Sequence, residues 1–370
     1  MNPGRRRPGL GLTSWQKLSR FLLKCIQKCH DDCKIDNMKR FACFCNNLYF
    51  GALFITSLKR DMVAIIVHGG AWNIPYGVVG AHRKGCVEAL RAGWKILKNG
   101  GSSEEAVERA INVMENDPVF DAGRGSHLNQ AGEIELDASI MNGTTFRCGA
   151  VAAVQNIRNP ISLARKIMDE SEHILLVGRG AVQFALEHGI KQCSQKDLLV
   201  GRELKRWKEF QKQHPRRVDT KAQFRKKARI GGQVASDTVG AAALDKFGVI
   251  CAGTSTGGTP NKYPGRVGDS PLIGCGTYAD SAIGGVSTTG WGEAMIKTVM
   301  AKTVIDLMEL NHGECQAAAD RAIEILERKA DGDGGIIAVT PKGRFAVAFN
   351  TARMARAYMN ETMRAPIVGV

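Results

Sequence analysis

The sequence lacks the long apolar run of a membrane-spanning helix. Such a helix needs roughly 20 apolar residues, and the longest candidate in these 370 residues is the stretch from Leu48 to Ile55. An apolar core followed by a small-residue cleavage site is also missing, which argues against secretion. We therefore expect a cytoplasmic protein that binds no membrane. The first thirty residues are basic, with Asp31 as their first acid, and weakly resemble a mitochondrial transit segment, which leaves a mitochondrial location open.

A regular cysteine framework is absent as well. The eleven cysteines are odd in number and scattered, whereas disulfide scaffolds are short and regularly spaced. The spacing of the five that lie near the start fits no pair of Cys-x-x-Cys zinc knuckles. These five are Cys25, Cys29, Cys33, Cys43 and Cys45. We expect reduced thiols, and no metal at these five residues.

Positive charge is concentrated in two segments. The whole chain carries +15. Residues 1–61 hold 12 Lys/Arg against 4 Asp/Glu, and residues 191–229 hold 14 against 4, so the two carry +8 and +10 and the remainder −3. A nucleic-acid binder would show its basic footprint on the folded surface, whereas lysine-rich runs are more often solvated. We expect no nucleic-acid partner.

The chain divides into an extension and one large body. Hydrophobic residues make up 44% of it, enough for a sizeable core. Residues 1–61 are predicted to be an N-terminal extension, because Met62 begins what already resembles a complete domain. Residues 191–229 are highly charged without a sustained apolar face, and they are predicted to form a long exposed linker, helical over residues 198–213.

Apolar periodicity predicts short strands and helices on both sides of this linker. Ser102 or Ser103 is expected to cap a helix that ends before Pro118. The predicted strands cover residues 63–67, 133–140, 149–154, 238–244, 249–255 and 282–288, with a hairpin of 335–340 and 345–349. The predicted helices cover residues 83–97, 103–117, 160–168, 180–188, 293–310 and 315–328.

Thr238 follows Asp237 and begins an apolar strand directly after the linker. A threonine in that place is ordinarily a strand former. If the peptide bond between the two residues were cut, Thr238 would gain a free α-amine, with a reference pKa of about 7.7 to 8.0, beside its own hydroxyl. One residue would then supply a nucleophile and its base. A flexible segment before the bond is what such processing needs.

Polar groups and glycines recur at strand ends downstream. Residues 254–258 and 287–292 place hydroxyls before glycines, which let a backbone approach a ligand, and the second segment suits an oxyanion hole. Between them, Arg266 and Asp269 stand three residues apart in a glycine-bounded loop. A guanidinium and a carboxylate so placed are suited to the α-carboxylate and α-ammonium of an amino acid.

Several separate blocks resemble one known family. The run TSTGGTPNKYPGRVGDSPLIGCGTYAD, with DTVGAAALD before it and STTGWGE after it, is similar to the isoaspartyl peptidase/L-asparaginase family of N-terminal nucleophile hydrolases. HGGAW (residues 68–72) and PVFDAGRGSHLNQAGEIELDASIMNG (residues 118–143) resemble that family's amino-terminal half. The resemblance runs from Met62 to about residue 360, and the blocks agree in spacing and order.

This resemblance implies an α+β fold, the four-layer αββα sandwich of N-terminal nucleophile hydrolases. It implies that the precursor cleaves itself at Asp237–Thr238 into an α chain (62–237) and a β chain (238–370) within one hydrolase domain, and that two such α/β units pair. The implied reaction releases L-aspartate from L-asparagine and from β-aspartyl (isoaspartyl) dipeptides, without a dissociable cofactor.

The resemblance also assigns roles by position. Thr238 matches the nucleophile, Thr256 the threonine that supports it, and Thr289 with Gly290 the oxyanion donors. The implied substrate-binding residues are Arg266, Val267, Gly268, Asp269, Thr289, Gly290, Trp291 and Gly292. In some members a loop matching residues 114–124 holds a structural sodium ion through backbone carbonyls, here those of Met114, Glu115, Asp117, Phe120, Ala122 and Arg124.

Three residues depart from the family's pattern. Asp121 stands where Asn is usual, and a carboxylate there is expected to favour a protonated amine on Thr238, slowing catalysis or shifting its pH optimum. Asp237 is typical of the glycosylasparaginase branch, but Ser236 stands where that branch has His. Asn142 replaces a common Asp at a turn, where we expect no consequence.

Three other interpretations remain open. A processing-defective relative, with cleavage impaired by Asp121 and Ser236, would act as a binding or scaffolding partner through its basic linker. A glycosylasparaginase-like amidase is favoured by Asp237 and disfavoured by the missing secretory signal. A protease that cuts after aspartate in intact proteins is disfavoured by Arg266 and Asp269, because that pair suits a free amino-acid unit.

Overall fold

The computed structural model describes residues 62–213 and 237–370. Residues 61–370 form one compact unit. The predictions for residues 1–61, for residues 214–229 and for Ser236 lie outside the described residues.

The described strands form one eight-stranded and one four-stranded sheet. The larger has the order β12-β11-β1-β5-β6-β2-β3-β4 and the smaller the order β10-β9-β8-β7. All neighbours are antiparallel except the parallel pair of β3 and β4. The strands are β1 Ala64–Trp72, β2 Leu136–Asn142, β3 Cys148–Val154, β4 Leu175–Val177, β5 Val239–Leu244, β6 Ile250–Thr256, β7 Thr277–Asp280, β8 Gly284–Gly290, β9 Gly334–Val339, β10 Phe345–Phe349, β11 Arg353–Asn360 and β12 Ile367–Gly369.

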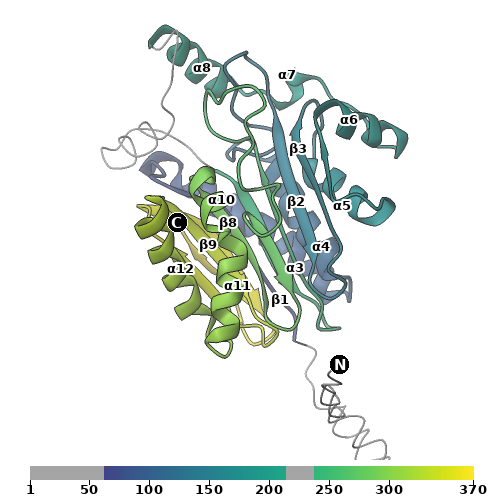
Figure 1. Cartoon of the computed structure of the whole chain (residues 1–370), viewed down its shortest axis with the longest axis vertical. Helices are drawn as coiled ribbons and strands as arrows, with labels where there is room; N and C mark the ends of the chain where they lie inside the picture. Colours follow the sequence, from purple (N-terminus) through teal and green to yellow (C-terminus); the bar gives the residue numbers. More distant parts are fainter. Residues whose placement is uncertain (1–61, 214–236) are drawn as a thin grey trace, which may run out of the picture. The chain divides into compact units, whose positions relative to one another are not determined.

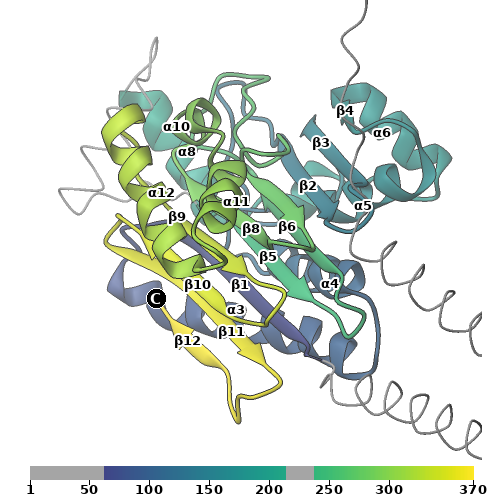
Figure 2. The ribbon, with the colours of Figure 1, turned by 60° about the horizontal axis from the view of Figure 1, so that its bottom comes forward.

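Helices cover the outer face of each sheet, which gives four layers (Figure 1, Figure 2). Helices α3, α4 and α5 pack on the large sheet, and α10, α11 and α12 pack on the small one. A third apolar cluster fills the space between the sheets. The predicted α+β sandwich is confirmed. The helices are α3 Tyr76–Lys98, α4 Ser103–Asn116, α5 Pro160–Glu170, α6 Gly178–Glu187, α7 Gln195–Leu198, α8 Gly201–Gln213, α10 Gly292–Thr298, α11 Met300–Leu310 and α12 Cys315–Ala330.

Strand β5 shows why these residues form an inner layer. Val239 and Ala241 join the apolar cluster under the helices, whereas Ala242 and Leu244 join the cluster between the two sheets. Both faces are buried, because successive side chains of a strand point to opposite faces. The small side chains allow close approach, and this brings the start of β5 to the edge where the polar strand ends meet.

Most of the predicted elements are present, with ends shifted by a few residues. Ser102 caps α4, and its side chain forms a capping box with Glu105. The hairpin of β9 and β10 is also confirmed. Strands β4, β7, β11 and β12 were not predicted. β11 pairs with β1 in the large sheet. Its sequence contains Arg353, Arg356 and Asn360 and forms no hydrophobic run, so nothing local indicated a strand.

The single helix predicted over residues 293–310 is wrong, because the chain breaks at Val299. That residue adopts a left-handed conformation with φ 45° and separates α10 from α11. The amides of Ala301 and Lys302 then donate to the carbonyls of Cys275 and Gly274. A helix start leaves its first amides without internal partners. The break therefore lets α11 dock on the loop before β7.

The exposed linker predicted over residues 191–229 is wrong for its described part. Residues 195–213 contain α7 and α8, and Leu198, Glu203 and Phe210 are buried. Leu204 and Trp207 pack against the main apolar cluster. The helix predicted over 198–213 is present from Gly201. Its few apolar residues are spaced to face the body, although charged residues outnumber them.

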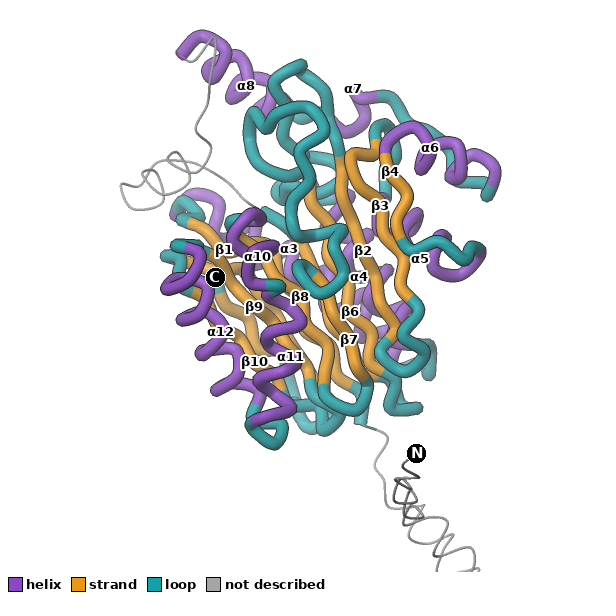
Figure 3. Tube along the Cα trace, viewed as in Figure 1, coloured by secondary structure: helices purple, strands orange, loops and turns teal. Residues whose placement is uncertain are grey.

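Figure 3 shows the strands of both sheets lying between the helical layers. No helix within residues 62–213 and 237–370 is long and apolar enough to span a membrane.

Candidate active site

Thr238 lies at the start of β5, next to the end of β6. The side-chain oxygens of Thr238 and Thr256 are 3.0 Å apart, and both residues are buried. The Thr256 hydroxyl oxygen also accepts a hydrogen bond of 3.0 Å from the amide of Gly258. The amide contact orients Thr256 toward Thr238, so the hydroxyl of the expected nucleophile is held in one place.

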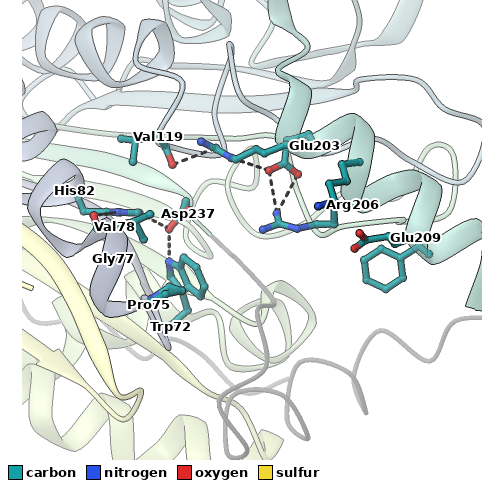
Figure 4. A pocket seen from close by; sticks show the side chains of 13 residues that line it. Trp72, Pro75, Gly77, Val78, His82, Val119, Glu203, Arg206, Glu209 and Asp237 are labelled. Carbon is teal, nitrogen blue, oxygen red and sulfur yellow. Dashed lines mark hydrogen bonds and ion pairs between the residues drawn. The ribbon is translucent and has the colours of Figure 1, made fainter.

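Asp237, on the other side of the same peptide bond, is anchored separately. Its carboxylate accepts hydrogen bonds from the indole of Trp72, at the end of β1, and from His82 Nε2 on α3 at 3.3 Å. Figure 4 shows the carboxylate lying between these two side chains. Burial opposes a charge on His82, but the neighbouring Asp237 outweighs it and raises the pKa of the imidazole. Both residues of the bond are therefore fixed from different elements.

Two cavities adjoin this bond and differ greatly in size. Beside Asp237 a cavity of 740 Å³ lies between the end of β1 and α8, and Figure 4 shows Arg206 and Glu203 on its far side. Around Thr238 the free volume is only 10 Å³. That is about the room that one water molecule needs.

The small cavity brings together most of the predicted site. Thr238, Thr256, Arg266, Gly268, Asp269, Gly290 and Gly292 line it, together with Gly258, Thr259 and Ser270. Val267, Thr289 and Trp291 do not line it. Val267 lies on the same loop between lining residues, and Trp291 is the N-cap of α10.

Arg266 and Asp269 each have a partner that the sequence did not suggest. The Nε and Nη2 atoms of Arg266 donate to the two carboxylate oxygens of Glu293 on α10, at 3.0 and 2.8 Å. Burial disfavours the charge of Arg266, but Glu293 outweighs it and raises the guanidinium pKa. Asp269 accepts a hydrogen bond of 2.9 Å from the Thr288 hydroxyl, and burial raises its pKa to about 6.

The two groups therefore lie in one loop, oriented by separate elements. Within the described residues the Nη1 atom of Arg266 makes no hydrogen bond, which leaves a donor for a carboxylate. Gly292 keeps the space open, because a Cβ there would lie 2.9 Å from Arg266 Nη2 and 3.0 Å from Asp269 Oδ1.

The expected oxyanion donors lie at the end of β8. The Thr289 hydroxyl is fully buried and has no hydrogen-bond partner in the described residues. A buried donor left without an acceptor is costly unless a ligand supplies one. Gly290 adopts φ 141°, and a Cβ there would lie 2.4 Å from the carbonyl oxygen of Asp333. Only glycine fits this turn.

A buried hydroxyl network lies beneath the site and was missed by the sequence reasoning. His68 Nε2 contacts Ser287 Oγ at 2.9 Å, and Thr254 Oγ1 lies 2.7 Å from the same Ser287 oxygen. Burial lowers the pKa of His68 to about 3, so the ring is neutral. These residues lie in HGGAW and in the two hydroxyl-rich segments, and those blocks were the available signal.

Asp121, the main departure from the family pattern, is also buried. Burial raises its pKa to about 6, although His127 acts in the opposite direction. The backbone amide of His127 donates to Asp121 Oδ1 at 3.0 Å, and the His127 ring lies between Asp121 and Glu203. The histidine and the glutamate were not among the predicted site residues.

The loop of residues 114–124 gathers backbone carbonyls around two glycines. A Cβ at Gly123 would lie 2.6 Å from the carbonyl oxygen of Glu115, and one at Gly125 would lie 2.5 Å from that of Phe120. Hard cations prefer such oxygen donors. No group of three or more His, Cys, Asp or Glu side chains in the described ranges is arranged to hold a metal ion. The carbonyl oxygens of Met114, Glu115 and Asp117 accept hydrogen bonds from the amides of Asp117, Arg124 and Phe120.

Comparison with known proteins points to one family. A sequence model described as asparaginase matches residues 61–368. A plant-type L-asparaginase of Pyrococcus abyssi is 44% identical over 326 residues, covering 84% of this chain and 100% of that protein. Two proteins named isoaspartyl peptidase/L-asparaginase are also similar. The one of Bos taurus is 43% identical over 292 residues (78% of this chain, 91% of that protein), and the one of Xenopus laevis 39% identical over 297 (80% and 92%).

Proposed function

Because this chain belongs to the asparaginase family, we propose that it is an autoprocessed threonine hydrolase that releases L-aspartate from L-asparagine and from β-aspartyl dipeptides. The observation that carries the proposal is the contact of Thr238 with Thr256 in the same small cavity as Arg266 and Asp269. A nucleophile and a site for the two charges of an amino acid lie side by side. Proteins named plant-type L-asparaginase and proteins named isoaspartyl peptidase/L-asparaginase are both similar to this chain.

The first step is self-cleavage. Thr238 Oγ attacks the carbonyl carbon of Asp237, the C–N bond breaks, and an ester and a free α-amine are formed. Water then hydrolyses the ester, which leaves a new carboxylate on Asp237 and restores the Thr238 hydroxyl. The separate anchoring of Asp237 by Trp72 and His82 holds the carbonyl in place while the hydroxyl approaches. This produces the α chain (62–237, after the N-terminal extension) and the β chain (238–370).

In the mature enzyme the α-amine of Thr238 takes the proton of its own hydroxyl. Oγ attacks the side-chain carbonyl of the aspartyl unit, while Thr289 Oγ1 and the amide of Gly290 donate to the developing oxyanion. The C–N bond breaks and ammonia, or the amine of the following amino acid, leaves with the proton. Water attacks the aspartyl ester and releases aspartate.

Substrate choice follows from the loop of Arg266 and Asp269. Arg266 pairs with a free α-carboxylate and Asp269 with a free α-ammonium, so an aspartyl residue within an ordinary α-linked chain lacks both partners. Gly268 and Gly292 have no side chain, which leaves space for the aspartyl unit. Val267 and Trp291 are the residues that precede these two glycines, and we assign them to the same binding segments.

Intact-mass spectrometry tests the processing. The purified 40.1 kDa chain is expected to yield a fragment that begins at Thr238. Thr238→Ala removes the attacking oxygen, so it should remain one chain and release no ammonia from asparagine. Thr362→Ala, an exposed hydroxyl that lines neither cavity, is the control and should still be cleaved. An intact wild-type chain would instead support the processing-defective relative.

Assays with three substrates separate the remaining alternatives. Aspartate release from asparagine and from an isoaspartyl dipeptide, without release from a glycosylated asparagine, is expected. The opposite pattern would favour a glycosylasparaginase-like amidase. Cleavage of an intact protein after an internal aspartate would favour a protease.

We also propose a structural sodium ion on the carbonyls of residues 114–124 and a pair of α/β units as the assembled form. The sodium ion would brace the loop without acting on the substrate, and no dissociable cofactor is needed. Replacing sodium by lithium in a thermal unfolding experiment should lower Tm, and light scattering should give twice the mass of one unit. Fluorescence of the tagged full chain tests the proposed cytoplasmic location.

A further inference from the structure

Helix α8 is joined to Thr238 by a continuous chain of buried polar contacts. We propose that Glu203 on this helix is a positioning residue for the reaction, holding the Asp121 loop against the threonine pair through His127. The role rests on the proposed function. This role gives α8, which lies before the proposed cleavage point, a part in catalysis. The charge of that segment alone had predicted an exposed linker.

The first contact joins α8 to His127. Glu203 is 1% exposed, and its Oε2 lies 2.6 Å from His127 Nδ1. Arg206 Nη1 lies 3.0 Å from both oxygens of the same carboxylate, and Arg202 Nε lies 2.9 Å from Oε1. Both oxygens of the Glu203 carboxylate therefore accept hydrogen bonds from these donors. The carboxylate holds the imidazole in one orientation.

The second contact joins His127 to Asp121. His127 Nε2 lies 3.4 Å from Asp121 Oδ2, and the His127 amide donates to Oδ1 at 3.0 Å. Both oxygens of the buried Asp121 carboxylate therefore face the same residue. An asparagine, usual at this position in the family, would place a neutral amide beside the ring.

The third contact leads to the nucleophile. The carbonyl oxygen of Asp121 accepts a hydrogen bond of 2.9 Å from the amide of Gly257, which directly follows Thr256. Gly257 has no room for a side chain, since a Cβ there would lie 2.5 Å from Asp121 Oδ1 and 2.4 Å from Ser126 Cβ. A shift of the Asp121 loop is therefore passed to Thr256, whose hydroxyl oxygen is 3.0 Å from that of Thr238.

Helix α8 has a second attachment beside this chain. The indole of Trp207 donates to the carbonyl oxygen of Asn129 at 2.8 Å, and its ring lies 3.1 Å from the position of a Cβ on Gly132. Because Glu203 and Trp207 are four residues apart, they lie on one face of the helix. That face holds residues 121–132 from two points.

The charges around His127 explain why a carboxylate is needed on α8. Asp121 and Glu203 face the ring with negative charge, Arg206 and Arg202 face Glu203 with positive charge, and Asp237 acts on Asp121. Arg206 also faces the ring, because its Nη1 lies 3.3 Å from His127 Nδ1, and it acts to lower the pKa of His127. Burial opposes a protonated His127, but the two carboxylates raise its pKa. Burial likewise opposes an ionised Glu203, but His127 outweighs it and lowers the pKa of Glu203 to about 2. An isosteric amide at residue 203 would keep the shape and remove one of the two charges that hold the imidazolium.

Glu203→Gln tests the proposal, with Glu327→Gln, an exposed carboxylate on α12, as the matched control. The measurements are the rate of precursor cleavage, kcat and KM for asparagine across pH, Tm, and the His127 titration by NMR. In Glu203→Gln we expect a lower His127 pKa, kcat reduced by about 10- to 100-fold, a size typical of small misplacements, and a changed acid limb of the pH profile. KM should change less than twofold, because Arg266 and Asp269 lie on another loop.

Glu203→Asp provides the rescue, since it keeps the charge and shortens the side chain. It should recover part of kcat and the wild-type form of the pH profile, which a purely structural role for the longer side chain would not predict. Should Glu203→Gln fail to fold, Glu203→Asp is compared with Asp121→Ala, which removes the other carboxylate beside His127. A wild-type His127 pKa and a kcat above that of Asp121→Ala support the proposal. A kcat of Glu203→Asp as low as that of Asp121→Ala overturns it.

Two other outcomes are distinguishable. If Glu203→Gln matches the control in kcat and pH profile while the wild type is active, the positioning role is wrong and the proposed function stands. If the wild-type chain neither cleaves itself nor hydrolyses either aspartyl substrate, the proposed function falls and this role falls with it.

Discussion

The proposed role of Asp269 makes activity depend on pH through the ionisation of its carboxylate. In the proposed mechanism its carboxylate binds an α-ammonium and must therefore be ionised, and burial raises its pKa to about 6. The α-amine of the cleaved Thr238 must be neutral to act as a base, and its reference pKa is about 7.7 to 8.0. Both requirements are lost on the acid side, the amine first and the carboxylate at lower pH.

We therefore expect a two-step acid limb in the profile of kcat/KM against pH. As pH falls below about 8 the logarithm should fall with a slope of one, and below about pH 6 the slope should approach two, since protonation of Asp269 adds a second loss. Asp269→Asn should have a low kcat/KM throughout and keep the slope of one below pH 6. An unchanged second break in that variant would contradict the assignment to Asp269.

At the scale of elements, the two sheets pack most tightly at β5, which directly follows the proposed nucleophile Thr238. Gly240, two residues after Thr238, lies where a Cβ would be 2.0 Å from Ser287 Oγ and 2.4 Å from His68 Nε2. The buried hydroxyl network therefore depends on the absence of a side chain on this strand. A larger residue would push β8 away from β5 and displace the proposed oxyanion donors, Thr289 and Gly290, at the end of β8.

Gly240→Ala should accordingly destabilise the protein by about 1–3 kcal/mol or more, the usual cost of overpacking, and lower the rate of cleavage. The matched control is Gly80→Ala inside α3, where a Cβ meets no atom within 4 Å. Alanine there should stabilise by about 0.5–1 kcal/mol, since glycine is costly in a helix interior. Thermal unfolding of both variants checks the two signs. Equal Tm values would contradict this account of β5.

At the scale of the whole molecule, residues from both sides of the proposed cleavage point share the large sheet. β1, from before Asp237, lies between β11 and β5, and β2 pairs with β6. The two chains produced by cleavage would therefore be joined by ladders of backbone hydrogen bonds and by a common core on each side of the sheet. Cutting one peptide bond removes none of these contacts.

We expect the cleaved protein to remain one particle. Size-exclusion chromatography of the processed sample should give a single peak that contains both fragments, and only denaturant should separate them. The uncleaved Thr238→Ala variant, run beside it, should elute at the same volume. Dissociation of the fragments under native conditions would show that the sheet does not hold the two chains together.

Neighbouring residues in the sequence were sufficient to predict much of the fold. The capping box of Ser102 and the hairpin of β9 and β10 follow from nearby residues, and the resemblance of several blocks indicated the layered fold and Thr238. Short-range rules act over a few residues, so they do not report a helix break such as Val299, which is decided by a loop bonding the first amides of α11.

Only the tertiary structure decided which charged side chains form pairs. Arg266 is paired with Glu293, 27 residues further on, and Glu203 with His127, 76 residues before it. A charged residue in a polar segment has the same local signature whether it faces water or a buried partner, because burial depends on distant elements. For that reason α8 resembled a linker in sequence, although it packs against the loop that contains His127 and Asn129.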